Sequence, residues 1–331
     1  MRQLVEGFIQ QLQQATQLGE RAIVTFSGPR YNNIVIAGMG SAGIAAELIK
    51  SYVADKLAVP VLVHKGYDVP AFVGFDTLFI AASFSGNTEE ILAVVRAVLG
   101  KDASLACVTS GGELQRIAQE NNLPHLIIPG ETGLPRASLG YTVVAMLYLL
   151  HYAGLLDDTF KMELAQSINL LQEQTGSIKV QASALASAFH GKLPVLYAGS
   201  TFKPVAQRLQ QQLNENAKQL AHVNVFPEMN HNELEGWRYP EQLLSQLAVL
   251  LIYTSYDHQR VRQRMHISTP VLKEKVGDVM TIEAAGATFL EQAFYLIHLF
   301  DWVSVYLAEL NDVDPNITDT INDLKDKLSK A

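Results

Sequence analysis

The sequence contains a single cysteine, Cys107, so no disulfide can form within the chain. Cys107 lies in the apolar run Leu105–Val108, a setting that favours a reduced and buried thiol over a reactive one. We therefore expect this residue to have a structural role, and we expect the fold to form without disulfides.

Long apolar runs are also missing. Residues 1–22 place apolar side chains at near-helical spacing among Gln and Glu, without the apolar core or cleavage site of a secretion signal. The most hydrophobic stretch, residues 141–156, is interrupted by His151 and is shorter than the ~20 apolar residues that a bilayer span needs. The sequence thus predicts a cytoplasmic protein without a membrane anchor, with a buried helix over this stretch.

The chain has fewer positive than negative side chains: 25 Lys and Arg against 33 Asp and Glu, which gives a net charge of −8. This balance argues against nucleic acid or an anionic membrane as the main partner. The basic run Arg260, Arg262 and Arg264 is interpreted as a solvated helix face or loop. A single phosphate ligand remains compatible, because backbone N–H groups and hydroxyls at a helix start can bind one whatever the net charge.

What the sequence does contain is a regular alternation of short apolar runs and helical patterns. The runs that predict strands are 33–37, 61–63, 77–82, 104–109, 125–128, 193–199, 222–226, 247–253 and 279–282. Helical patterns occupy 44–53, 89–98, 204–221, 290–310 and 318–328, and a long helical stretch covers 139–189. This order indicates parallel, doubly wound α/β sheets. Because it occurs twice, we predict two lobes, residues 1–150 and 151–331.

The segment Gly38–Gly43 fits the pattern G-x-G-x-x-G between a predicted strand and a predicted helix. A dinucleotide enzyme would need an acidic residue at the end of the second strand, but the strand 61–63 is followed by His64, Lys65 and Gly66. A nicotinamide enzyme is therefore disfavoured. We expect this turn to offer backbone contacts to some other ligand.

A second turn, Ser83–Thr88, holds three hydroxyls around a glycine, directly before a helix that begins with two glutamates. Hydroxyls and free backbone N–H groups at the positive end of a helix dipole can bind a phosphate without a metal or a lysine. An ordinary helix cap is the alternative, but a cap needs only one hydroxyl. The turn therefore predicts a phosphate site.

Two further residues, Glu215 and His231, could carry acid–base chemistry. An aldose–ketose isomerase needs one base to move a proton between C1 and C2, and a second acid–base group to open the sugar ring. A helix-surface carboxylate and a loop histidine are the plainer interpretations. His231 with Glu233 and Glu235 could also bind a metal, although the i, i+4 histidine pair of the familiar zinc helices is absent. The residues alone leave these alternatives open.

Taken together, these motifs resemble the bifunctional phosphoglucose/phosphomannose isomerases, which are built from two sugar isomerase (SIS) domains. The likeness extends over most of the chain and depends on the order and spacing of Gly38–Gly40, Ser83–Thr88, Leu134–Ala137, Leu213–Lys218, Asn230–Glu233, Asp301–Tyr306, Asp314–Pro315 and Leu324–Lys325. It implies an α/β fold of two doubly wound parallel-sheet lobes, SIS-type and flavodoxin-like, with flanking helices.

The resemblance implies an enzyme of carbohydrate metabolism that interconverts glucose 6-phosphate or mannose 6-phosphate with fructose 6-phosphate through a cis-enediol. It also implies a homodimer that uses neither a metal nor an organic cofactor. The alternative is a non-catalytic SIS-domain protein that senses a sugar phosphate. Such a sensor would have no need for both Glu215 and His231.

The resemblance also implies roles for single residues. The substrate phosphate would be bound by Gly40, Ser41, Ser83, Ser85 and Thr88. Among the catalytic residues, Glu215 would be the proton-transferring base, and His231 would assist ring opening from the neighbouring subunit. Arg136 would stabilise the enediolate, Lys325 would act at the ring oxygen, and Thr318 would be linked to the acceptance of both C2 epimers.

The chain departs from the family pattern in one place. After Gly-Met-Gly the family continues Gly-Ser-Ala, whereas this chain has Ser41, Ala42 and Gly43, so Ala42 occupies the usual serine position. A missing neutral hydrogen bond costs on the order of 1 kcal/mol, or about fivefold in affinity. We therefore expect weaker phosphate binding unless Ser41 replaces the lost donor.

Overall fold

A computed structural model gives the structure of the protein and describes residues 1–26, 30–328 and 330. The chain divides into two compact units, each with its own parallel sheet. The N-terminal unit consists of Glu6–Glu173 with Ala285–Tyr295. The C-terminal unit consists of Met1–Val5, Gln174–Ala284 and Leu296–Ala331. The predicted lobe boundary after residue 150 stays a prediction.

The N-terminal unit contains a five-stranded parallel sheet in the order β2-β1-β3-β4-β5. Its strands are β1 (Asn33–Gly38), β2 (Val61–His64), β3 (Thr77–Ser83), β4 (Ser104–Thr109) and β5 (His125–Ile127). Every residue of β3 is buried, which explains its continuous apolar run, because helices cover both faces of a parallel sheet. The predicted doubly wound parallel α/β sheet is confirmed.

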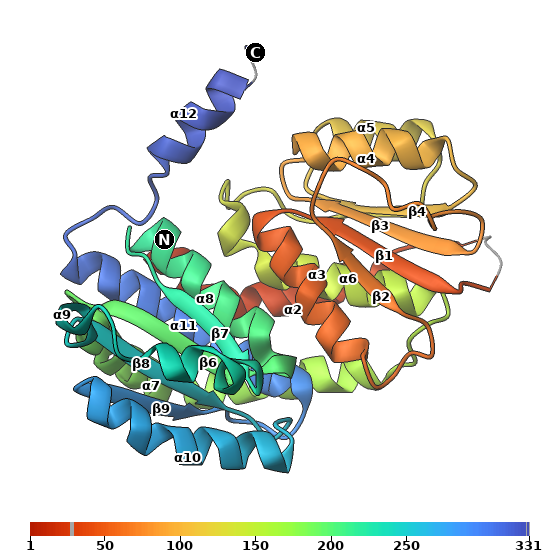
Figure 1. Ribbon diagram of the computed structural model, residues 1–331. Helices are drawn as coiled ribbons and strands as arrows, with labels where there is room; N and C mark the ends of the chain where they lie inside the picture. The colour runs from red at the N-terminus through yellow and green to blue at the C-terminus, as the bar shows by residue number, and fades with distance from the viewer. Residues whose placement is uncertain (27–29, 329, 331) are drawn as a thin grey trace. The chain divides into compact units, whose positions relative to one another are not determined.

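The helices of this unit lie on opposite faces of the sheet (Figure 1). They are α2 (Phe8–Arg21), α3 (Gly40–Val53), α4 (Glu89–Leu99), α5 (Gly112–Glu120) and α6 (Leu139–Tyr152), with a 3₁₀ turn η1 at Pro135–Ala137. The helices α4 and α5 cover one face, and α3 and α6 cover the other, with α2 packed on α6. Cys107 is buried in the core beneath α4 and α5, and burial raises the pKa of its thiol to about 12.

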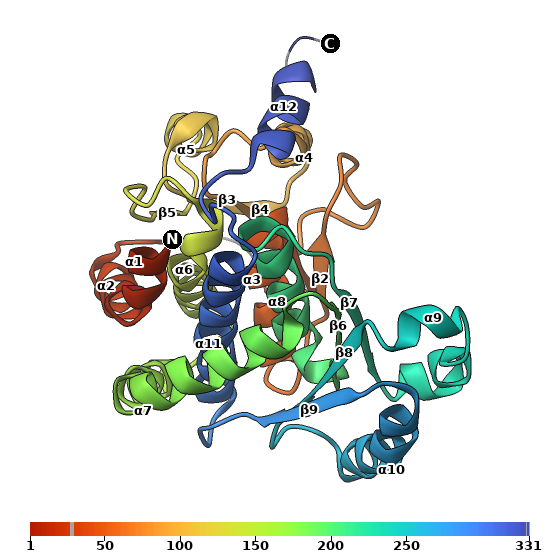
Figure 2. The ribbon, with the colours of Figure 1, turned by 90° about the vertical axis from the view of Figure 1, so that its left-hand side faces the viewer.

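The C-terminal unit contains a four-stranded parallel sheet in the order β7-β6-β8-β9. Its strands are β6 (Leu193–Gly199), β7 (His222–Phe226), β8 (Leu247–Tyr253) and β9 (Asp278–Glu283). Its main helices include α8 (Lys203–Asn216), α10 (Gln259–Lys275) and α12 (Asp319–Leu328). Because β7 and β9 lie on opposite sides of β6 and β8, right-handed connections place α8 and α10 on opposite faces, as Figure 2 shows.

The remaining elements are short, apart from two long helices that contribute to both units. Those two are α7 (Thr159–Phe189) and α11 (Phe289–Leu310). The short elements are α1 (Arg2–Glu6), α9 (Glu241–Leu244), η2 (Ser200–Phe202), η3 (Glu228–His231) and η4 (Glu233–Gly236). By length and composition α11 could cross a membrane, but 83% of its most apolar window is buried, as in the core helix of a soluble protein.

Two element predictions need correction, and a third is narrowed to one of its two alternatives. The helix predicted over 204–221 ends at Asn216, because Lys218 adopts a left-handed backbone conformation with φ 55°. The helical stretch 139–189 is two helices, α6 and α7, which are separated by a turn at Gly154 with φ 72°. The basic run 260–264, left open as a helix face or a loop, lies on α10.

Candidate functional site

The carboxyl ends of β1 and β3 form the point at which the strand order of the N-terminal sheet reverses. The helix that follows β1 lies on one face of the sheet, and the helix that follows β3 lies on the other (Figure 1). Ligands of open α/β sheets bind outside the strands at this position. Gly38 pairs with Ala82 in the parallel register, so the glycine turn, Gly38–Gly43, and the serine turn, Ser83–Thr88, begin side by side. The structure thus brings together the residues that were predicted to bind phosphate.

Two hydroxyls of the serine turn, those of Ser83 and Thr88, face each other, and Thr88 does not cap α4. Ser83 Oγ lies 2.7 Å from Thr88 Oγ1 and accepts a hydrogen bond of 3.1 Å from the Gly86 amide. The Asn87 amide donates to Ser85 Oγ at 3.2 Å. Thr88 is the N-cap residue of α4, yet its side chain makes no capping hydrogen bond. The cap interpretation therefore does not account for the hydroxyls, and the helix start retains unsatisfied N–H groups for an anion.

The loop that follows β4 fixes the serine turn from the side. Gly86 has φ 68°, and a Cβ atom there would lie 1.8 Å from the Gly111 carbonyl oxygen. The Gly86 carbonyl accepts a 2.9 Å hydrogen bond from the Leu114 amide, and the Phe84 carbonyl accepts one of 2.6 Å from the Ser110 hydroxyl. Only glycine fits at position 86, and these contacts hold the turn in one conformation.

Close packing of the first turn of α3 on β1 explains two residues of the glycine turn. A Cβ atom at Gly38 would lie 2.8 Å from the Ala42 carbonyl oxygen, and one at Gly43 would lie 2.7 Å from the Gly38 oxygen. Ser41 Oγ is shielded from solvent and has no hydrogen-bond partner in the described structure. The structure thus places a hydroxyl one position before Ala42, where the resemblance leads us to expect a serine.

Arg136 lies in the same unit, in the 3₁₀ turn η1, which follows the carboxyl end of β5 and packs on α3. Its side chain is buried, with the residue only 4% exposed. Gln11 ties the end of this turn to the start of α6, donating to the Ala137 carbonyl at 2.7 Å and accepting from the Gly140 amide at 2.8 Å. A permanent positive charge is therefore fixed near the carboxyl edge of the sheet that also carries both turns.

The two predicted acid–base residues occupy opposite edges of the C-terminal sheet. Glu215 is in the last turn of α8, which begins at the carboxyl edge after β6 and runs back along β6 and β7 for 14 residues, or roughly 21 Å. His231 is an exposed residue of η3, which follows the carboxyl end of β7. One copy of this unit therefore does not bring the carboxylate and the imidazole together.

A row of buried polar side chains fixes α8 against α11. Arg208 and Asp301 form a two-pronged ion pair with distances of 3.2 Å and 3.0 Å, and Gln212 donates to Asp301 at 2.8 Å. One turn further, the Asn216 amide donates to the Ser304 hydroxyl at 2.9 Å. A buried ion pair must be fully hydrogen-bonded to be tolerated, so these contacts fix the orientation of the helix end beside the predicted base.

Glu233 anchors the loop that carries His231. Its carboxylate accepts hydrogen bonds from Tyr197, from Asn224 and from His222, the last at 3.0 Å. Burial acts to raise the pKa of Glu233, but hydrogen bonds from His222, Tyr197 and Asn224 outweigh it and lower the pKa to about 2. The same contact raises the pKa of His222. Glu233 is thus a structural anion.

The metal alternative finds no support in this geometry. Both oxygens of Glu233 are engaged by hydrogen-bond donors, and Glu235 forms a separate surface ion pair with Arg238 at 2.6 Å. Among the described residues, no group of three or more His, Cys, Asp or Glu side chains could hold a metal ion. Sequence reasoning missed the anchoring residues Tyr197 and Asn224, because they meet only through the pairing of β6 with β7.

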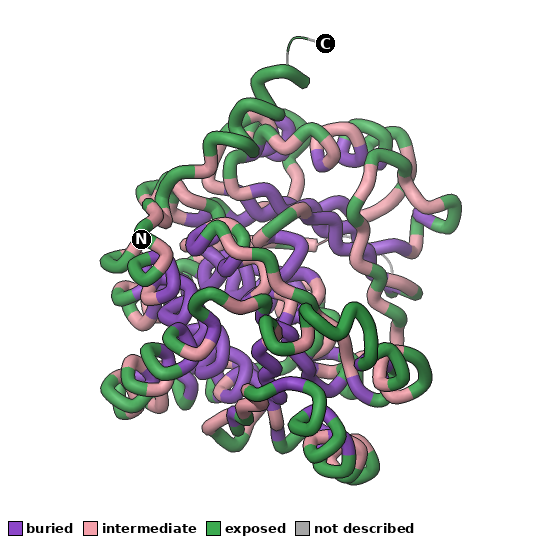
Figure 3. The backbone as a smooth tube through the Cα atoms, turned by 60° about the vertical axis from the view of Figure 1, so that its left-hand side comes forward, coloured by how far each residue is buried: buried purple, intermediate pink, exposed green. Residues whose placement is uncertain are grey.

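The last two predicted residues, Thr318 and Lys325, lie beyond α11 in the C-terminal unit. Thr318 directly precedes α12, and its carbonyl accepts hydrogen bonds from two amides of the first helical turn. Lys325 is an exposed residue of α12, a helix without any buried residue (Figure 3).

Comparison with known proteins gives a consistent result along the whole chain. The model of the SIS domain matches residues 30–154, and the model of the bacterial phospho-glucose isomerase C-terminal SIS domain matches residues 178–328. Over 330 residues the chain is 34% identical to the bifunctional phosphoglucose/phosphomannose isomerase of Caldicellulosiruptor bescii, covering 97% of this chain and 96% of the relative. The enzyme of the same name from Aquifex aeolicus is 35% identical over 301 residues, 91% of each chain.

A solved structure supports the fold at lower sequence identity. A hypothetical protein from Thermus thermophilus superimposes with a TM-score of 0.76 at 14% identity, covering 99% of this chain and 90% of that one. This likeness concerns the fold alone.

Proposed function

Because the chain belongs to the family of bifunctional phosphoglucose/phosphomannose isomerases, we propose that it interconverts glucose 6-phosphate and mannose 6-phosphate with fructose 6-phosphate. It is an enzyme, an aldose–ketose isomerase of sugar phosphates. The observation that carries the proposal is the meeting of the serine turn and the glycine turn where the strand order reverses. Such a substrate and a net charge of −8 suit the cytoplasm rather than a membrane surface.

The phosphate of the substrate binds the hydroxyls of Ser83, Ser85 and Thr88 together with backbone N–H groups of both turns. Two features support this assignment: the hydroxyls are not used as helix caps, and the turn is held rigidly by the loop after β4. Gly40, with φ 50°, starts α3 beside them, and Ser41 supplies a further hydroxyl. A rigid set of donors binds an anion without an ordering cost.

Glu215 acts as the base of the isomerisation. It removes the proton from C2 of the open-chain aldose and returns a proton to C1, while a proton leaves the C2 hydroxyl and one is gained at O1. The intermediate is a cis-enediol, and the exchange balances without an external oxidant. The fixed guanidinium of Arg136 stabilises the negative charge that develops on the enediolate oxygens.

His231 assists ring opening and comes from the partner subunit of a homodimer. The placement of Glu215 and His231 at opposite edges of one sheet supports this assignment, because hydrogen-bond reach is about 3 Å, whereas α8 alone spans roughly 21 Å. Lys325 acts at the ring oxygen, and Thr318 allows either epimer at C2 to bind.

The alternative is a sugar-phosphate sensor that binds but does not isomerise. Incubation of the protein with fructose 6-phosphate in deuterated water separates the two functions. An isomerase with a proton-transferring base places deuterium at C2 of the aldose product and at C1 of the recovered ketose. If neither carbon gains deuterium while the sugar phosphate still binds, the sensor function replaces the isomerase.

A further inference from the structure

Lys218 makes an unusual set of contacts directly after α8. Its ammonium donates to three backbone carbonyls, those of Glu215 at 2.5 Å, Asp314 at 3.0 Å and Ile317 at 2.7 Å. The residue adopts φ 55°, a left-handed conformation that is uncommon for a side-chain-bearing residue and turns the chain sharply at the end of α8. An ammonium carries three N–H donors, so three carbonyls match its full donor set.

The contacts join two parts of the chain that are far apart in sequence. One carbonyl belongs to the predicted base, while the other two lie 96 and 99 residues further along the chain, at the start of the C-terminal segment, residues 314–328. A positive charge is favourable at this place because a helix ends in unpaired, partly negative carbonyls. Lys218 therefore caps α8 and binds the C-terminal segment with the same group.

Apolar packing does not secure this segment within the described structure. The helix α12 has no buried residue, and Ile317, Ile321, Leu324 and Leu328 are 46%, 42%, 58% and 53% exposed. In the absence of a buried apolar face, the position of α12 depends on the polar contacts of the residues that precede it. The ammonium of Lys218 supplies two of these contacts.

We propose that Lys218 is a positioning residue that fixes the C-terminal segment to the end of α8, so that Lys325 and Thr318 hold a set position relative to Glu215. The inference rests on the proposed function for the roles of those three residues. The contact between the ammonium and the carbonyls is independent of it. Arginine is a poor substitute, because its planar guanidinium does not match three carbonyls that converge on one nitrogen.

The first test is Lys218→Met, which keeps an unbranched side chain about as long as the aliphatic stem of lysine but removes all three donors. We expect amide hydrogen exchange to accelerate about tenfold in residues 314–328, while exchange in β3 and β6 stays unchanged. The kcat should fall by about tenfold or more with the KM for the sugar phosphate changed less than threefold, since the phosphate contacts lie elsewhere. Exchange that is unchanged in residues 314–328 would overturn the proposal.

A chemical rescue separates this role from a general effect on folding. In Lys218→Cys, alkylation with 2-bromoethylamine restores an ammonium at nearly the length of lysine, and 2-bromoethanol gives a neutral side chain of equal length. Labelling is selective, because the only native cysteine, Cys107, is buried and burial raises its pKa to about 12. The amine should restore slow exchange and kcat, and the alcohol should not. Equal recovery with both reagents would refute a role for the charge.

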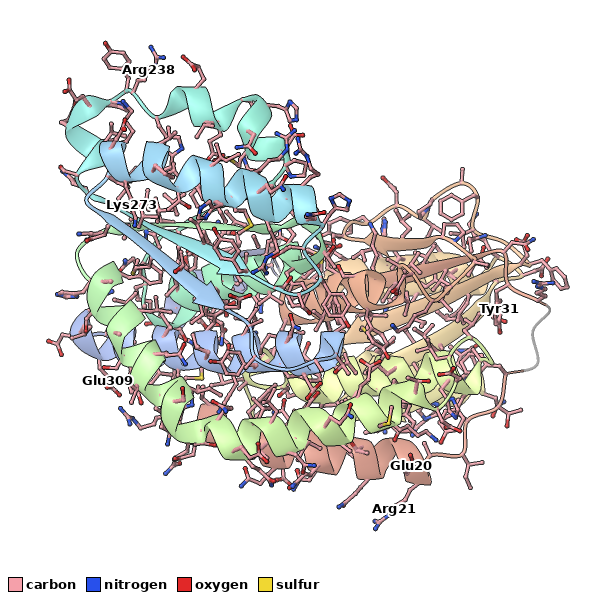
Figure 4. The ribbon with its side chains drawn as sticks, turned by 90° about the horizontal axis from the view of Figure 1, so that it is seen from below. Glu20, Arg21, Tyr31, Arg238, Lys273 and Glu309 are labelled. Carbon is pink, nitrogen blue, oxygen red and sulfur yellow. The ribbon has the colours of Figure 1, made fainter. Side chains whose placement is uncertain are left out.

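Lys273→Met is the matched control, because Lys273 is an exposed lysine of α10 in the same unit (Figure 4). It should leave exchange and kcat within twofold of the parent protein. If the parent protein shows no isomerase activity, the proposed function fails, but the exchange and rescue results still decide whether Lys218 fixes the segment.

Discussion

At the scale of single residues, the charge of Glu215 should matter for turnover and not for folding or binding. Glu215→Gln keeps the shape of the side chain and removes the base. We expect kcat to fall by about 10³-fold, within the range that general bases contribute, with binding of the sugar phosphate close to normal. Isothermal calorimetry with fructose 6-phosphate measures the second quantity. Lost binding with a normal circular dichroism spectrum would make Glu215 a ligand-positioning residue.

The hydroxyls of the two turns should contribute to binding of the sugar phosphate and not to turnover. Ser85→Ala removes a hydrogen-bond partner of the phosphate, so KM should rise about fivefold while kcat changes little. Ser41→Ala is the companion variant, because Ser41 Oγ is shielded and without a partner in the described structure. If Ser41 supplies the hydroxyl that Ala42 lacks, KM rises by a similar factor. An unchanged KM in both variants would place the phosphate elsewhere.

The sequence pointed to some of the candidate residues and missed others, for a physical reason. The serine turn is a local pattern, and its hydroxyls lie within six consecutive residues that a sequence displays directly. The contacts of Glu233 are different. Tyr197 and Asn224 reach it from paired positions of β6 and β7, and the sequence does not give this register. The burial of Arg136 likewise depends on the tertiary fold, which brings η1 against α3, and its neighbours in sequence do not reveal it.

At the scale of elements, the stability of the 3₁₀ turns η3, which carries His231, and η4 should depend on the negative charge of Glu233. Its pKa lies near 2 instead of the ordinary 4.5, so its contribution to stability is complete above pH 4.5 and is lost as the pH falls toward 2. The raised pKa of His222 makes stability depend on pH in the opposite direction. Its contribution is complete below pH 6.5 and is lost as the pH rises through the raised value.

Glu233→Gln should therefore destabilise the protein most between pH 4.5 and 6.5, where both contributions are present. Urea unfolding in that window should show a loss of about 2 kcal/mol, as expected for hydrogen bonds to a charged group. Glu235→Gln is the control from the same 3₁₀ turn, because Glu235 pairs with Arg238 at the exposed surface and such pairs contribute little. A loss that does not vary with pH would mean that Glu233 is not ionised.

How well each helix or strand was predicted depends on the strength of its apolar pattern in the sequence. The strands were predicted closely, because a strand that is buried on both faces is apolar without interruption, as in β3. The helix α10 was not predicted as an element, since it buries only Met265, Ser268 and Leu272 and contains Pro270 in its interior. The end of α8 was misplaced because it depends on Lys218, two of whose three carbonyl partners lie nearly a hundred residues away.

At the scale of the whole molecule, the proposed residues are distributed over both units. The phosphate contacts and Arg136 belong to the N-terminal unit, and Glu215, His231, Thr318 and Lys325 belong to the C-terminal unit. The proposed isomerase therefore needs both units. Within the C-terminal unit, Glu215 and His231 lie at opposite edges of one sheet, and for this reason we propose that a second copy of the chain supplies the imidazole.

Hybrid dimers test that requirement. Glu215→Gln and His231→Ala homodimers should each be nearly inactive, and His231 is exposed, so its truncation should not disturb folding. If each site combines Glu215 of one subunit with His231 of the other, a hybrid dimer contains one intact site. Random exchange of equal amounts then recovers about a quarter of the parental activity, because about half of the dimers are hybrids and each has one working site of two. If both groups act from the same subunit, every hybrid site lacks one of them, and the mixture stays as inactive as its components.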